Sequence, residues 1–197
     1  MKKQILFLLV VLSLIAMPLW AENPGVATGQ AAHFFADSKT IKLQVSGSAI
    51  ALADPLAGPF PVLTNMEGSG NIGQISGQGM YLYNQLEFDI YGESILEVLE
   101  GQTSCRFKIN GDVLLVVFDP GKTGWLQITD LATGSAVFEQ EWTGKIVGGT
   151  GRFEGVKGTF SKSARGFAVL FTEYGPANAV VMPWTGTMKI QMEQLEE

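Results

Sequence analysis

Residues 138–146 read Phe-Glu-Gln-Glu-Trp-Thr-Gly-Lys-Ile, and the pattern of this stretch decides the fold class. Large apolar side chains at its first, fifth and last positions alternate with charged and polar side chains between them. A repeat of two residues is typical of a β-strand that buries one face. The same repeat returns near both ends of the chain, in residues 41–49 and 180–190. The sequence therefore predicts an all-β protein.

Other segments of strand-like composition lie between these three, separated by turn signals. The strand candidates are 60–66, 69–76, 78–91, 104–109, 112–118, 124–130, 156–163 and 166–172, and the turn candidates are 110–112, 119–121, 133–135 and 174–176. Residues 92–101 fit either a strand or one to two turns of helix. Glycines inside the strand patterns favour tight bending, which closing a sheet requires. We expect a closed antiparallel β-barrel of about eight strands.

Composition excludes several kinds of site. The 197 residues contain one Cys and one His, which is too few for a disulfide framework or a zinc site. The net charge of −6 argues against a nucleic-acid partner, because such proteins use a basic surface. We predict no metal and no cofactor.

The N-terminus has the order of regions typical of a secretory signal peptide. Lys2 and Lys3 precede an apolar run over 5–17, and Ala21 ends the segment before polar residues. The alternative, a membrane anchor, would need about 20 apolar residues. We therefore predict export to the periplasm or the extracellular space. The longest later apolar run, Val113 to Phe118, is too short for a membrane span.

The mature chain reads as a single domain. Residues 1–21 form the predicted signal peptide and residues 22–39 an N-terminal arm without a sustained period. The barrel domain is predicted over 40–190, and 191–197 form a short acidic tail.

The glycine-rich stretch 148–153, Gly-Gly-Thr-Gly-Arg-Phe, predicts a tight turn between two strands, with glycines that permit positive φ. It is not a dinucleotide fingerprint, because Glu154 stands where the third glycine would be. Residues 146–160 resemble the strand–turn–strand signature of the allene oxide cyclase/dirigent-like β-barrels, including exported bacterial members of unassigned role. The resemblance implies a calycin-like, allene oxide cyclase-like barrel with an apolar interior, often a homotrimer.

The resemblance does not transfer a catalytic site. The plant cyclases place a carboxylate near the first barrel strand, whereas residues 40–53 contain no acid and Asp54 follows them. His33 and Cys105 lack partners nearby in sequence, and Glu139 with Glu141 fits a solvated outer face. The sequence shows no catalytic constellation.

Four aromatic residues are the candidate ligand-binding residues: Phe138, Trp142, Phe160 and Trp184. They either line a cavity or fill the barrel, and the sequence leaves both open. The favoured function is binding of a small apolar molecule in or at the barrel. The alternatives are a cyclase- or isomerase-type enzyme and a structural envelope protein with a packed barrel. An interior cavity above a few hundred cubic ångströms favours binding, and a filled interior favours the structural role.

Sequencing the N-terminus of the protein from its native host tests the predicted export. The mature chain should begin at Glu22 or within a few residues of it, because signal peptidase cuts after a small residue such as Ala21. Recovery of the intact Met1 from the cytoplasm would contradict the prediction.

Overall fold

The computed structural model describes residues 40–52, 59–87, 89–108, 110–172, 175–176 and 179–193. All of these belong to one compact unit, residues 31–197. The predicted signal peptide, the arm with His33, Asp54 and the tail from residue 194 onward lie outside the described residues.

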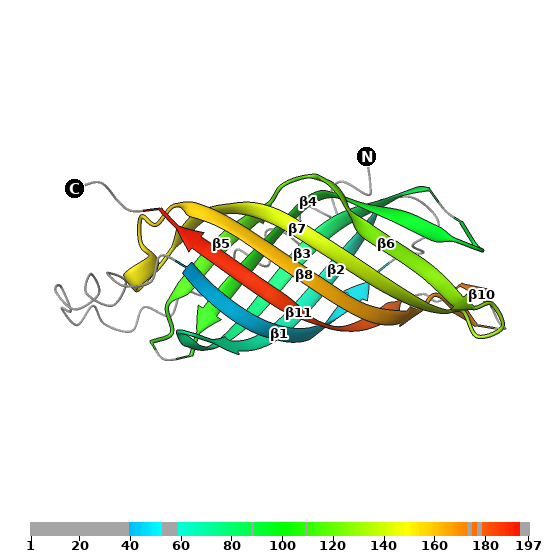
Figure 1. The fold of residues 1–197 in the computed structure, drawn as a ribbon, viewed down its shortest axis with the longest axis horizontal. Helices are drawn as coiled ribbons and strands as arrows, with labels where there is room; N and C mark the ends of the chain where they lie inside the picture. The colour runs from blue at the N-terminus through cyan, green and yellow to red at the C-terminus, as the bar shows by residue number, and fades with distance from the viewer. Residues whose placement is uncertain are drawn as a thin grey trace. The chain divides into compact units, whose positions relative to one another are not determined.

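Nine antiparallel strands form one sheet that closes on itself (Figure 1). They are β1 (Thr40–Ala51), β2 (Phe60–Gly70), β3 (Gly73–Glu87), β4 (Glu93–Phe107), β5 (Val113–Phe118), β6 (Gly121–Asp130), β7 (Ser135–Gly149), β8 (Gly158–Val169) and β11 (Val180–Met192). Strands β5 and β6 lie end to end between β4 and β7, so they share one position and the barrel has eight. A separate short pair joins β9 (Phe171–Thr172) to β10 (Gly175–Pro176). The predicted closed antiparallel barrel is confirmed.

The first and last strands complete the barrel. Strand β1 pairs with β11 over its whole length, from Thr40 opposite Gln191 to Ala51 opposite Val180. Side chains then alternate between the interior and the outer surface, as the period of two predicts. In β7 every second residue from Ala136 to Ile146 is buried. Glu139 and Glu141 are exposed on the outer face, as expected.

The predicted turn at 119–121 is wrong, because the chain continues through it from β5 into β6. The register opposite β4 is the same before and after it. Opposite β7, residues 119–123 face only 141–143, so the break is a bulge with two extra residues. Pro120 has no N–H for the ladder. Asp119 still bonds across, since its N–H donates to the Thr143 carbonyl at 2.9 Å.

Other segment boundaries also differ from the prediction, and one open alternative is decided. Residues 93–101, from the stretch that fits either strand or helix, are strand and belong to β4. The turn between β2 and β3 falls at residues 71–72, within the predicted strand 69–76. The Asn71 side chain fixes this turn to β1, because its oxygen accepts a hydrogen bond from the Lys42 N–H and its amide group donates one to the Thr40 carbonyl, both at 3.0 Å. Strand β8 is continuous where two strands were predicted, at 156–163 and 166–172, and the last strand, β11, ends at Met192.

The connection between β7 and β8 contains the 3-10 helix η2 (Gly151–Phe153) and closes one end of the barrel. Phe153 is fully buried against Phe107, with ring centroids 4.7 Å apart. Arg152 lies over both rings and contacts Asp112, with Nε 3.0 Å from a carboxylate oxygen. We call Phe107, Asp112, Arg152 and Phe153 the end plug. Within the described ranges, no helix has the length and apolarity needed to cross a membrane.

The glycine-rich turn behaves partly as expected. Gly151 has φ of +57°, in the left-handed region, whereas Gly148 and Gly149 are not among the positive-φ glycines. A Cβ on Gly149 would lie 2.5 Å from the Cβ of Phe153, so this glycine permits close packing. A Cβ on Gly151 would overlap the Asp112 carboxylate that binds Arg152.

Replacing Gly151 with Ala should destabilise the protein by more than replacing Gly155. Gly155 also has positive φ, at +74°, but no atom lies within 4 Å of a Cβ there. G155A should therefore cost only the backbone strain, about 1–2 kcal/mol. G151A should cost about 1 kcal/mol more, because it also displaces Asp112 in the end plug. Denaturant unfolding measures both, with G148A as the neutral control. Equal losses for the two variants would show that Asp112 moves without cost.

Candidate functional site

A cavity of about 60 Å³ lies inside the barrel at the end opposite the end plug. Its lining includes residues at the strand ends on that side of the barrel: Ala51 at the end of β1, Phe60 at the start of β2 and Val180 at the start of β11. We call it the barrel-end cavity. It is lined by Ala49, Ala51, Phe60, Val62, Thr64, Tyr81, Tyr83, Leu96, Leu126, Phe138, Gln140, Trp142, Lys162, Ala164, Leu170, Val180, Met182 and Trp184.

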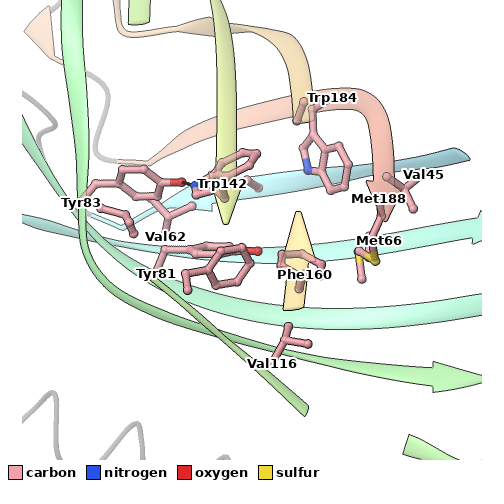
Figure 2. Close-up of a cluster of buried hydrophobic side chains, with 14 of the residues drawn as sticks. Val45, Val62, Met66, Tyr81, Tyr83, Val116, Trp142, Phe160, Trp184 and Met188 are labelled. Carbon is pink, nitrogen blue, oxygen red and sulfur yellow. Dashed lines mark hydrogen bonds between the residues drawn. The ribbon is translucent and has the colours of Figure 1, made fainter. Parts of the chain in front are cut away.

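Buried aromatic side chains form one wall of the cavity, and hydrogen bonds orient them. Figure 2 shows the indole of Trp142 facing Tyr83, where Nε1 donates to the hydroxyl at 2.8 Å. The Trp184 Nε1 donates to Thr64 Oγ1 at 3.2 Å. These bonds give each buried indole N–H a partner, as a buried polar group requires. The wall is therefore fixed before any ligand binds.

Strand β1 leaves room for the Trp184 indole at Gly47. The two residues are directly opposite each other in the β1–β11 ladder. A Cβ on Gly47 would lie 2.9 Å from the Trp184 ring and would also overlap the Asn65 carbonyl. A glycine is thus required where the indole crosses the inner face of β1.

Lys162 projects into this aromatic wall. It is 4% exposed, and its Nζ lies 3.8 Å from the centroid of the Trp184 ring and 5.0 Å from that of Trp142. The Tyr81 ring is 5.8 Å away. None of the described residues lining the cavity is acidic, and no described residue forms a hydrogen bond or ion pair with this amine. Among the described residues, the groups placed to stabilise its charge are therefore the faces of these rings.

Burial changes the protonation of Lys162. Loss of water lowers the pKa of its amine to about 7, and the neighbouring Cys105 opposes this to a smaller extent. The aromatic faces also favour the charged form, because the ring quadrupole attracts a cation. The amine is consequently present in both the neutral and the charged form near neutral pH.

The other buried titratable groups near the site stay neutral. Burial raises the pKa of the Cys105 thiol to about 12, so this cysteine is an inert core residue at neutral pH. Burial likewise raises the pKa of Tyr81 and of Tyr83 well above the usual tyrosine value. Lys162 is therefore the group at this site that can change charge near pH 7.

Three of the four residues predicted from the sequence meet at the cavity. Phe138, Trp142 and Trp184 line it, each between 5% and 6% exposed. Phe160 is buried deeper in the barrel and does not line it. Its ring packs edge-on against Phe118, with centroids 5.1 Å apart, so it belongs to the core.

Sequence reasoning missed Lys162 and Gln140. Both occupy inward-facing positions of their strands. Along β8, Lys162 is two residues from Phe160 and from Ala164, which are both buried, and along β7, Gln140 is two residues from the buried Phe138 and Trp142. Such a position is a usable signal for polar residues in a barrel interior. For Lys162 the charge of the side chain outweighed this signal, because a lysine on a strand normally lies on the outer face.

The described residues offer no metal site, since no group of three or more His, Cys, Asp or Glu side chains comes together in them. Comparisons with protein-family models, with curated proteins and with solved structures find no match to this chain.

Replacing Lys162 with Met should make stability depend on pH in a predictable way. The unfolded lysine keeps its ordinary pKa of 10.5, whereas the folded one is near 7, so the unfolded state binds more protons between these values. The unfolding free energy of the wild type should therefore rise relative to that of K162M by up to about 1.4 kcal/mol per pH unit. K162M should be the more stable protein at pH 7, and this advantage should shrink toward pH 9.5.

Urea unfolding of both proteins at pH 6, 7, 8 and 9.5 measures this difference, and other titrating groups cancel in the comparison. Lys145→Met, which removes an exposed amine from β7, is the matched control and should show a far smaller trend. A constant difference between wild type and K162M across this range would contradict the assigned burial.

Proposed function

We propose that this protein binds a small, mainly apolar molecule in the barrel-end cavity. The observation that carries the proposal is an unfilled apolar space beside a buried amine that has no ionic partner among the described residues. A barrel selected for packing alone gains nothing from a buried lysine, which destabilises the fold. Groups with strongly shifted pKa values facing a cavity are typical of functional sites.

The cavity limits the size of the ligand. Its 60 Å³ lies below the few hundred cubic ångströms that would favour binding, so most of the barrel interior is filled by side chains and the volume alone favours the structural role. The buried amine beside the remaining space is the feature that favours binding. Since one water molecule needs about 10–15 Å³ of cavity volume, the space holds about four to six non-hydrogen atoms. A short aliphatic chain with one polar group fits this volume. Longer molecules would require the lining side chains to move.

Two alternatives remain as competitors to be separated by experiment. A structural envelope protein would have the same filled core and would bind nothing in the cavity. A cyclase- or isomerase-type enzyme would need groups that act on an intermediate, and the described cavity lining holds one amine and no carboxylate. Binding needs only the apolar lining and the space, and we favour it for that reason.

We further propose that the chain is an exported member of the allene oxide cyclase/dirigent-like barrels. The closed eight-position barrel and the glycine-rich connection between β7 and β8 support this proposal. The N-terminal pattern of residues 1–21 supports export.

Titration with n-butanol, followed by tryptophan fluorescence, tests ligand binding. Trp142 and Trp184 both line the cavity and should report its occupation. A four-carbon chain gains about 3 kcal/mol on burial, so we expect a saturable change with a dissociation constant in the millimolar range. n-Octanol, which exceeds the volume, should bind no better than n-butanol.

Ala164→Val is the matched cavity-filling variant. The added methyl groups occupy part of the space, so n-butanol should bind at least about fivefold more weakly while the melting temperature stays at or above the wild-type value. Val181→Ala changes a side chain on the outer face of β11 and should leave binding unchanged. A linear fluorescence change that is identical in all three proteins would favour the structural role.

A further inference from the structure

We propose that Lys162 is a covalent capture site for a small aliphatic aldehyde or ketone, which it holds in the barrel-end cavity as an imine. This proposal rests on the proposed function, since the carbonyl compound must first occupy the cavity. It adds the chemical class of the ligand and the atom that binds it.

The geometry places the amine where a carbonyl carbon can reach it. Lys162 lines the cavity, and the rings of Trp142 and Trp184 lie on its sides at 5.0 and 3.8 Å from Nζ. These rings restrict the otherwise flexible lysine chain to one place, so the nucleophile is oriented before the ligand arrives. An amine in a desolvated apolar pocket is an arrangement that activates lysine toward carbonyl compounds.

The protonation state fits the same reaction. Only the neutral amine attacks a carbonyl, and burial lowers the pKa of Lys162 to about 7, so the neutral form is available at neutral pH. The titratable groups that face it are Cys105 from β4 and Tyr81 and Tyr83 from β3, and burial raises the pKa of all three. No carboxylate of the described cavity lining is present to hold the amine in its charged form.

The reaction balances without an oxidant or reductant. The Nζ lone pair forms a bond to the carbonyl carbon, and the carbonyl π electrons move to oxygen. Both protons of the neutral amine then transfer to that oxygen, the C–O bond breaks and a C=N bond forms. One water molecule leaves for each imine formed, and hydrolysis reverses the capture.

A neutral carbonyl fits the lining better than a carboxylate does. Burying a carboxylate requires several hydrogen-bond donors, and most hydroxyls here already have partners. The Thr64 hydroxyl donates to the Ser48 carbonyl at 3.2 Å, and the Tyr81 hydroxyl pairs with Thr103 at 3.0 Å. An aldehyde brings no charge into the cavity and needs only the amine.

The experiment incubates the full-length protein with butanal and sodium cyanoborohydride, which reduces an imine to a stable secondary amine. Peptide mass mapping then locates each butyl group. We expect Lys162 to be modified at least about tenfold faster than the exposed Lys145 at pH 7, because burial favours the neutral, nucleophilic form of the Lys162 amine. Modification of Lys162 should level off just above pH 7.

Two variants separate the site from general lysine reactivity. K162M, checked for folding by its thermal melt, should lose the fast-forming adduct, whereas K145M should retain it at the wild-type rate. n-Butanol should compete with butanal and slow modification of Lys162 but not of Lys145.

The remaining outcomes overturn the proposal in distinguishable ways. If n-butanol binds saturably but butanal modifies Lys162 no faster than Lys145, the covalent proposal fails and the proposed function stands. If butanoate binds more tightly than n-butanol in the wild type but not in K162M, the charged amine is an anion receptor and the covalent proposal fails again. If n-butanol, butanal and butanoate all fail to bind, the proposed function and this inference fall together.

Discussion

The pairing of β1 with β11 is the constraint on which the rest of the structure depends. This ladder joins the first strand to the last, from Thr40 opposite Gln191 to Ala51 opposite Val180, and turns an open sheet into a barrel. Once the barrel is closed, one of the two alternating sets of side chains in each strand faces the interior and the other faces outward. Lys162 has the same parity as Phe160 and Ala164 in β8, so it must enter the core together with them. The buried amine is a consequence of register.

The two ends of the barrel surround a buried cationic side chain with different neighbours. At one end Arg152 lies over the rings of Phe107 and Phe153 and also contacts the carboxylate of Asp112. An arginine stays charged at any ordinary pH, so a carboxylate partner stabilises it there. At the other end Lys162 has ring faces and an open cavity but no acidic partner among the described lining residues. A lysine can lose its proton. The surroundings of Lys162 therefore suit a reactive amine, whereas the charged pair of Arg152 and Asp112 suits a group that closes the end of the barrel.

Strand parity explains both the success and the failures of sequence reasoning about the site. Phe138, Trp142 and Trp184 could be predicted, because a large aromatic side chain on the apolar face of an alternating strand is almost always inside. Phe160 is inside too, but its depth along the barrel depends on how the strands are staggered, which one strand does not reveal. Lys162 was missed since charge normally marks an outer face. The bulge at residues 119–123 was missed because Asp-Pro-Gly commonly makes a turn.

The sequence by itself determined the fold class, since a repeat of two residues with glycines inside the strands and at the turns is a local property that can be read along the chain. It also determined that the interior is rich in aromatic side chains, and it placed the connections at residues 110–112 and 133–135. Only the tertiary structure decided which of those side chains meet, how much space they leave, and that a lysine shares it. Those features depend on the stagger of eight strand positions and on closure between residues more than 100 apart in sequence, as in the hydrogen bond from Trp184 to Thr64. The shifted pKa of Lys162 arises from the loss of water around it, and that loss exists only once the barrel has closed.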